Sequence, residues 1–102
     1  MADTAFKDFI VDQLATMSGL KCRAMFGGYG LYRNEIFFGI IHRDRLYFKT
    51  DGESAAAYLE RGMDSFQPNE KQKLIHYYEV PPEVIDRADQ LQQWATRALR
   101  CK

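Results

Sequence analysis

The sequence has no excess charge of either sign and no long apolar segment. Its 14 basic residues balance 14 acidic ones within 102 residues, so no net field favours DNA, RNA or an anionic membrane. The longest apolar run, Ile36 to Ile41, is far too short to span a bilayer. The N-terminus lacks the basic segment and apolar core of a secretory signal. We therefore expect a cytoplasmic protein with one domain, residues 1–102.

Cysteines and the usual catalytic motifs are also scarce. Cys22 and Cys101 lie far apart with no CxxC pattern, which favours reduced thiols over a structural disulfide. His42 and His76 have no cysteine or carboxylate at ligand spacing, whereas a metal site needs three or four converging ligands. No GxSxG motif is present, and neither thiol has a base beside it in the sequence. The sequence thus predicts no catalytic residue, no cofactor and no metal, as in a non-enzymatic protein.

A periodic apolar pattern is present, and its period changes along the chain. Apolar residues at helical spacing predict a first helix that ends at Gly19. Alternation then predicts three strands between Cys22 and Asp51, separated by short polar turns. A short helix over 55–61, two more strands and a final helix opened by Pro82 follow. The predicted fold class is α+β, a two-layer arrangement in the order α-β(3)-α-β(2)-α with five antiparallel strands.

Glycines are concentrated in the stretch MFGGYGLYRNEIFFGII, residues 25–41. A phosphate cradle needs a glycine loop that opens a helix, but Gly27, Gly28 and Gly30 are followed by another strand. The aromatic strand motif of RNA-binding domains also fails, because Gly27 occupies its basic position and the element order differs. The glycines instead indicate a bent sheet, either one bulged strand or a two-residue Gly27-Gly28 hairpin. We expect a bulge or a positive φ at Gly28 or Gly30.

Six motifs in a fixed order resemble one known family. The chain contains, in this order, MFGGYGLY, FFGII, RLYFKTD, RGMDSF, HYYEVPPEV and LQQWATRAL. Together they resemble the N-terminal domain of the TfoX/Sxy competence regulators, from about Arg23 to Leu99. The resemblance implies an α-β(3)-α-β(2)-α fold with a five-stranded antiparallel sheet, and it favours one bulged strand over a Gly-Gly hairpin.

The same resemblance implies a setting for the function. Full-length members of this family act in bacteria as transcriptional coactivators of DNA-uptake genes, beside a cyclic-AMP-responsive activator. They carry a second, C-terminal domain that resembles helix-hairpin-helix DNA binders, which these 102 residues do not include. The resemblance implies no catalytic residue for the N-terminal domain.

Two groups of residues are candidates for a partner contact. A small basic-aromatic patch at the third predicted strand consists of Arg43, Arg45, Tyr47 and Lys49. Tyr77 and Tyr78 are adjacent in a later strand, so their rings point to opposite faces. We expect one of these rings to pack and the other to be exposed, where it would favour a protein contact.

The final helix carries the single tryptophan of the chain. Trp94 lies beside the apolar stripe of that helix, so we expect it to anchor the helix to the sheet near Leu91 and Ala98. Asp86 or Asp89 can divide the segment into a short turn and a long helix. These residues, with the three glycines, are predicted to have structural roles.

The sequence favours a regulatory or protein-interaction domain, with a protein partner or a second copy of the chain. It predicts no membrane contact and no sequence-specific DNA binding by this domain alone, because basic residues are not clustered. The alternative is a small-ligand-binding domain or an enzyme that uses the exposed face of the sheet. A deep pocket with convergent polar groups would favour this alternative, and a flat apolar patch would favour the protein contact.

Overall fold

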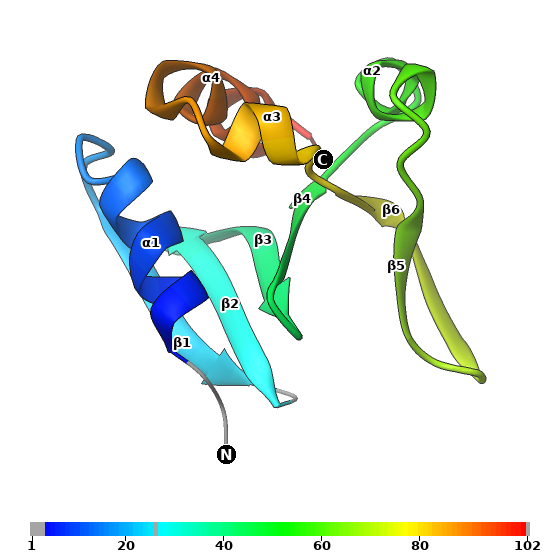
Figure 1. Cartoon of the computed structure of the whole chain (residues 1–102), viewed down its shortest axis with the longest axis horizontal. Helices are drawn as coiled ribbons and strands as arrows, with labels where there is room; N and C mark the ends of the chain where they lie inside the picture. Colours follow the sequence, from blue (N-terminus) through cyan, green and yellow to red (C-terminus); the bar gives the residue numbers. More distant parts are fainter. Residues whose placement is uncertain (1–3, 26, 102) are drawn as a thin grey trace.

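Helices and one antiparallel sheet make up the described part of the chain (Figure 1). The computed structural model describes residues 4–25 and 27–101. All paired strands are antiparallel, in the order β1-β2-β3-β4-β6-β5. The predicted α+β class is confirmed. The elements are α1 (Ala5–Gln13), β1 (Leu20–Met25), β2 (Gly28–Arg33), β3 (Ile36–His42), β4 (Arg45–Lys49), α2 (Ala55–Glu60), β5 (Ser65–Asn69), β6 (Gln72–Glu79), α3 (Pro82–Ile85) and α4 (Ala88–Leu99).

The sheet has six strands, so the predicted five strands and the predicted element order are wrong. The segment expected to be one bulged strand is a hairpin, in which β1 pairs with β2 and Met25 lies opposite Gly28. Gly27 lies in the connection with a φ of 75°, a conformation that glycine adopts without steric cost. A hairpin is therefore correct, but its turn is not Gly27-Gly28 as that alternative had it, because Gly28 belongs to β2. The last helix is divided after Asp86, as predicted, into α3 and α4.

The expectation for Gly28 and Gly30 is also wrong in detail. The positive φ belongs to Gly27, while Gly28 and Gly30 lie in the regular pairing of β1 with β2. Both glycines are nevertheless required for close approach: an added Cβ would overlap the carbonyl oxygen of Ile41 at Gly28 and the Met25 sulfur at Gly30. Packing between neighbouring strands, rather than backbone conformation, explains these two positions.

A register shift between β2 and β3 decides which β3 side chains face the helices. Tyr32 pairs with Phe37 but Leu31 pairs with Gly39, so Phe38 is an extra residue in β3. Such a bulge interrupts the alternation of side chains along the strand. As a result Phe38 packs in the core beneath the helices, whereas Phe37 joins a second cluster on the other face.

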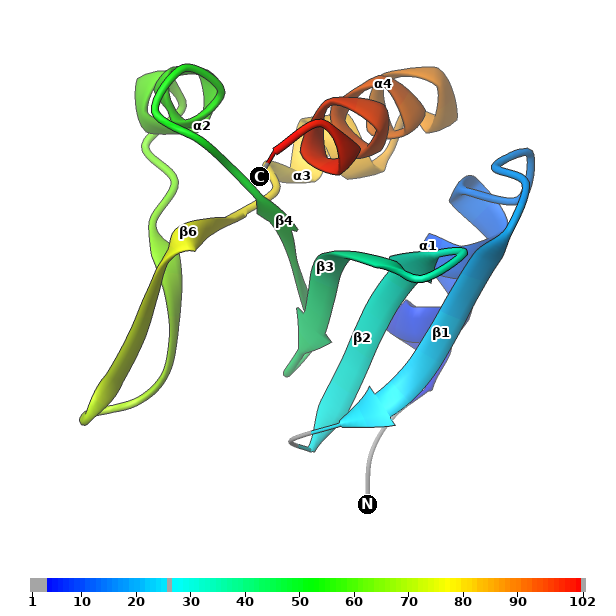
Figure 2. The same cartoon turned by 180° about the vertical axis from the view of Figure 1, so that it is seen from behind.

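The main core lies between the sheet and helices α1, α3 and α4 (Figures 1 and 2). Neither view shows a helix over the opposite face of the sheet, which holds the smaller second cluster. No helix within residues 4–25 and 27–101 is long and apolar enough to cross a membrane. Fully buried residues of the main core include Ile10, Leu14, Leu31, Phe38, Leu46, Phe48, Val80, Leu91 and Ala95.

The polar hairpin turns form where the sequence predicted them. Asn34 connects β2 to β3 with a φ of 55°, and Arg43 and Asp44 connect β3 to β4 with φ of 51° and 61°. Two successive residues with positive φ match the twist of the strands that they join. Arg43, a member of the predicted basic-aromatic patch, therefore has a backbone role in this turn.

Candidate functional site

The predicted basic-aromatic patch does not form one surface. Arg43 is exposed in its turn and makes no hydrogen bond or ion pair with another described residue. Arg45 is also exposed, but its Nη1 donates to Oε1 of Glu79 at 3.1 Å. An exposed ion pair of this kind contributes little stability. It partly neutralises Arg45, so Arg43 is the cation on this turn that is left without a partner in the described chain.

The other two members of the patch lie in different environments. Tyr47 is buried and packs against Phe66, with ring centres 4.5 Å apart, and burial raises the pKa of the Tyr47 hydroxyl. Lys49 is half-buried at the end of β4 and lines a groove between α2 and α4. The four positions of the patch thus differ in burial: Arg43 and Arg45 are exposed, Lys49 is half-buried and Tyr47 is buried.

Aromatic rings gather on the face of the sheet that no described helix covers. The ring centres of Tyr32 and Phe37 are 5.1 Å apart, and those of Phe37 and Tyr77 are 5.7 Å apart. The guanidinium of Arg23 lies 5.3 Å from the centre of the Tyr32 ring, a cation–π contact. We call this surface the open aromatic face, defined by Tyr32, Phe37, Tyr47, Phe66 and Tyr77.

Tyr77 and Tyr78 lie on opposite sides of β6. Tyr77 belongs to the open aromatic face, whereas Tyr78 packs against the main core with its ring centre 5.9 Å from that of Tyr58. Sequence reasoning did not select Tyr32, Phe37 or Phe66. Alternation alone could not place Phe37, because the bulge at Phe38 changes which face of the sheet the β3 side chains point to.

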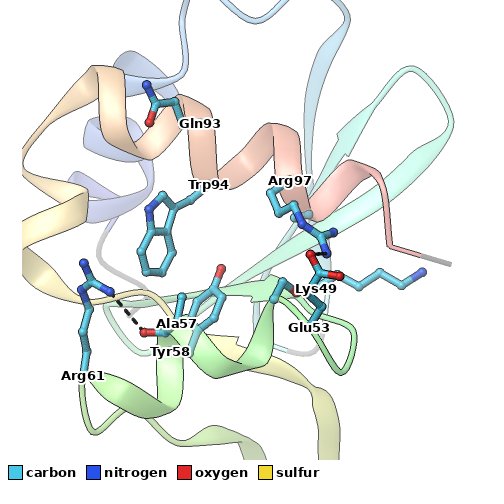
Figure 3. Close-up of a pocket in the computed structure, with 10 residues that line it drawn as sticks. Lys49, Glu53, Ala57, Tyr58, Arg61, Gln93, Trp94 and Arg97 are labelled. Carbon is cyan, nitrogen blue, oxygen red and sulfur yellow. Dashed lines mark hydrogen bonds and ion pairs between the residues drawn. The ribbon is translucent and has the colours of Figure 1, made fainter.

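A groove of about 450 Å³ opens between α2 and α4 (Figure 3). Its floor contains Trp94 and Tyr58, whose rings meet edge to face with centres 4.7 Å apart and planes at 72°. The guanidinium of Arg61 lies 5.1 Å from the centre of the Trp94 ring. Trp94 is half-buried against the main core, and its ring pairs with a residue of α2 rather than with a strand. This tryptophan therefore joins two helices.

The groove is held together at one end by Arg97 and Asp51. Nη2 of Arg97 donates to both carboxylate oxygens of Asp51, at 3.1 and 3.0 Å. Oδ1 of Asp51 also accepts the backbone N–H groups of Glu53 and Ser54, at 3.0 and 2.8 Å. These contacts, above all the N–H of Ser54, lower the pKa of Asp51 from 3.8 to about 2. The carboxylate thus ties α4 to the turn that begins α2.

Both cysteines are free. Cys101 is buried beside this end of the groove, with its sulfur 3.6 Å from the carbonyl oxygen of Lys49 and 3.8 Å from the Ser54 hydroxyl. Cys22 is half-buried beneath α1, and burial raises the pKa of its thiol. A raised pKa keeps Cys22 protonated and unreactive at neutral pH.

The two histidines do not converge on one site. His42 meets Phe66 edge to face with ring centres 5.3 Å apart, and burial lowers the pKa of His42. His76 is exposed on β6. Within residues 4–25 and 27–101, no three His, Cys, Asp or Glu side chains are grouped so that they could hold a metal ion.

Residues 12–102 match the family model of the TfoX N-terminal domain. The chain belongs to this family. The resemblance read from the sequence is therefore confirmed. The chain is also similar to DNA transformation protein TfoX1 of Aliivibrio fischeri, with 33% identity over 60 residues, which are 57% of this chain and 29% of that relative. The match covers less than a third of the relative's length.

This TfoX N-terminal domain thus presents two surfaces on which a partner or ligand could bind. One is the open aromatic face, in which Tyr32, Phe37 and Tyr77 are half-buried and the other two rings are buried. The other is the groove between α2 and α4, which is lined by cations around two aromatic rings. The first resembles a protein contact surface, and the second has the size of a small-molecule site.

Proposed function

We propose that this domain is a non-enzymatic, cytoplasmic regulatory domain that acts by contact with another protein in the control of DNA transformation. The family and the name of the TfoX1 relative support the biological setting. The open aromatic face is the single observation that supports the protein contact. Tyr32, Phe37 and Tyr77 are its half-buried members, and tyrosines are enriched among the residues that dominate binding energy at interfaces.

The borders of this face indicate the chemistry of the partner. Arg23 lies over the Tyr32 ring, and Lys49 pairs in register with Tyr77 across β4 and β6. Cations beside an apolar centre favour a partner with apolar side chains flanked by carboxylates, because complementary charges at an interface rim speed and orient association. We infer an acidic-apolar protein surface as the occupant. A second copy of this domain is the competing occupant.

The test uses a photoreactive residue at one position on the face and one position elsewhere. p-Benzoylphenylalanine replaces Tyr32 on the open aromatic face, or Leu59, which is 58% exposed on α2. In cells of the source organism under transformation conditions, we expect Tyr32 to give a discrete cross-linked partner that Leu59 does not give. A cross-link to the domain itself would identify the second copy instead. Equal cross-linking from both positions, or none, would contradict the proposal.

A functional assay distinguishes a regulatory contact from an incidental one. The double variant Tyr32→Ala/Tyr77→Ala should lower the frequency of transformation, while Leu59→Ala should leave it unchanged. Both variants must keep the melting temperature of the wild type, so that a change in transformation is not caused by unfolding. Normal transformation with the double variant would refute a regulatory role for this face.

The groove between α2 and α4 supports a second candidate, a small-ligand-binding domain. Sequence reasoning assigned such a site to the exposed sheet face, but the convergent polar groups line the helices instead. The two candidates use different surfaces, so one domain can have both functions.

A further inference from the structure

One edge of the sheet has the regular geometry that accepts a further strand. β1 is at the end of the strand order, pairs only with β2 among the described strands, and is the outermost strand on its side in Figure 2. Its pairing with β2 has no register shift, and β1 contains no proline. The opposite edge differs, because β5 contains Pro68 and has two register shifts against β6. Proline and bulges obstruct the addition of a strand, whereas a regular edge is a template for it.

The pairing of β1 with β2 shows which backbone groups of β1 face outward. Just before β1 begins, the N–H of Asn34 donates to the carbonyl oxygen of Gly19 at 2.8 Å. Hydrogen-bonded and non-hydrogen-bonded pairs alternate along an antiparallel ladder. Leu20, Cys22 and Ala24 therefore direct their N–H and C=O groups away from β2. These are the groups that an added strand would bind.

The edge is bordered by an apolar groove on the main-core side. This groove has a volume of about 530 Å³ and lies between α1 and the start of β1, with Val11, Met17 and Leu20 among its lining residues. None of the lining residues belongs to β2, so the groove is on the outer side of β1. Asp8 and Asp12 also line it, which disfavours carboxylates there. An added strand would direct every second side chain over this groove.

The other side of the same edge carries cations. Lys21 and Arg23 are exposed and alternate with the residues of β1 that pack against the main core. Lys21 lies 3.4 Å from a carboxylate oxygen of Glu35. Arg23 lies over the Tyr32 ring and makes no ion pair with another described residue. Arg23 is therefore the cation that can pair with a carboxylate of an added strand.

The charges of β1 disfavour a second copy of this domain as the added strand. In a symmetric antiparallel pair, opposed residues point to the same face, so centring the pair on Cys22 would oppose Lys21 of each copy to Arg23 of the other. Centring the pair on Lys21 or on Arg23 would oppose that residue to its own copy. Like charges directly opposite each other destabilise a strand pair. A different chain with acidic side chains is favoured.

We propose that an extended segment of the partner protein adds a strand along β1, with apolar side chains over the groove beside α1 and a carboxylate opposite Arg23. Main-chain hydrogen bonds to Leu20, Cys22 and Ala24 supply the affinity, and the alternating side chains supply the specificity. This inference rests on the protein contact proposed for the open aromatic face, because Arg23 borders that face. It defines the acidic-apolar partner as a segment in which acidic and apolar residues alternate.

The first test uses the synthetic peptide Glu-Val-Glu-Val-Glu-Val, called the acidic peptide, and the complete, isotope-labelled chain. In the free domain, the outward amides of Leu20, Cys22 and Ala24 should exchange with solvent faster than those of Lys21 and Arg23. The acidic peptide should shift the β1 resonances saturably. At about ten times its dissociation constant, it should slow exchange of the three outward amides about tenfold. The basic peptide Lys-Val-Lys-Val-Lys-Val should bind at least about fivefold more weakly.

Two pairs of variants test the backbone and the charge separately. Ala24→Pro removes an outward N–H without breaking a bond to β2, so it should weaken binding of the acidic peptide at least about fivefold, whereas Ala24→Ser should leave it unchanged. Arg23→Glu should reverse the preference between the acidic and basic peptides. Lys73→Glu makes the same change of charge at an exposed position on β6, and it should keep the preference of the wild type.

The same backbone variants are then combined with p-benzoylphenylalanine at Tyr32 in cells. Ala24→Pro should reduce the cross-link to the partner at least about fivefold, and Ala24→Ser should retain it. An undiminished cross-link in Ala24→Pro would overturn strand addition but leave the contact at the open aromatic face in place. Absence of any Tyr32 cross-link would contradict the proposed function, and the peptide titration would then decide strand addition by itself.

Three results with the purified domain would also overturn strand addition by a partner segment. One is a linear, non-saturating shift with the acidic peptide, and another is unchanged exchange at Leu20, Cys22 and Ala24 when the peptide is bound. The third is slow exchange of these three amides at high protein concentration without peptide, which would show that β1 pairs with a second copy.

Discussion

Alanine substitutions at the glycines of the β1–β2 hairpin provide a strong test of how closely the strands pack. At Gly28, an added Cβ overlaps the carbonyl oxygen of Ile41 and lies 3.2 Å from the Cα of His42. Both neighbours are backbone atoms of β3, which no change of rotamer can move. Relief therefore requires β2 and β3 to separate, at the cost of their hydrogen bonds and of core packing.

The magnitude follows from this geometry. Overpacking typically costs about 1–3 kcal/mol and occasionally more, and a clash with backbone belongs at the upper end. A change of 1 kcal/mol lowers the melting temperature of a domain of this size by about 4–8 °C. We therefore expect Gly28→Ala to lower the melting temperature by at least about 12 °C. Because total stability is typically about 5–15 kcal/mol, the variant should still fold at low temperature.

Three further alanine variants separate the causes. Gly30→Ala meets the flexible end of Met25 and should cost less than Gly28→Ala, because that side chain can move. Gly27→Ala meets nothing within 4 Å but has a φ of 75°, which costs an alanine about 1–2 kcal/mol. Gly52→Ala has open space and no positive φ, so it should stay within about 0.5 kcal/mol of the wild type.

Thermal unfolding followed by circular dichroism gives the ranking, and urea unfolding gives the free energies. The expected order of destabilisation places Gly28 first, Gly27 and Gly30 next, and Gly52 last. Should Gly28→Ala melt within a few degrees of Gly52→Ala, the close approach of β2 to β3 would be refuted. A larger loss at Gly27 than at Gly28 would mean that backbone conformation, rather than strand packing, explains the glycine pair.

The remaining predictions concern the helices, the pH dependence and DNA. Trp94→Ala should lower the free energy of unfolding by less than the roughly 3–5 kcal/mol of a fully buried tryptophan, because Trp94 is half-buried. Trp94→Phe should lower it by less again. An unchanged melting temperature in Trp94→Ala would show that the contact with Tyr58 contributes nothing to stability. The pKa of Asp51 falls from 3.8 to about 2 on folding. The stability that the wild type gains over Asp51→Asn should therefore be complete above pH 4 and disappear as the pH falls to 2. An equal difference between the urea midpoints of the two proteins at pH 5 and at pH 2 would contradict this. The isolated domain should bind promoter and scrambled duplexes equally weakly near physiological salt, because its charges balance; tight binding that prefers the promoter would make it a DNA reader.

The local pattern of the sequence was sufficient for most of the elements. The alternation from Leu46 to Lys49 predicted a strand, and Pro82 correctly marked the start of α3. Both signals depend on neighbouring residues, because a turn or a helix start is formed by contacts within a few positions. The division after Asp86 was predictable for the same reason. The family resemblance implied the correct fold class. It also favoured one bulged strand for the glycine-rich segment, which is wrong because that segment forms a hairpin.

The candidate surfaces were less predictable because they depend on contacts between distant positions. Arg97 and Asp51 are 46 residues apart, and nothing near either one indicates the other. Tyr58 lies in a helix of six residues, too short for a periodicity that would mark its buried side. The basic-aromatic patch does not form one surface for the same reason, because Tyr47 packs against Phe66 and Arg45 is paired with Glu79, both from distant strands.

The sequence by itself determined the class of fold, the turns and the family of this chain, because apolar periodicity and glycine or proline positions act over a few residues. Only the tertiary structure decided that residues 20–33 form two strands and that Phe38 is an extra residue in β3. It also decided that α2 and α4 enclose a groove between them. The physical reason is that strand register and helix contacts are fixed by how side chains from distant segments fill the same space, which no local pattern specifies.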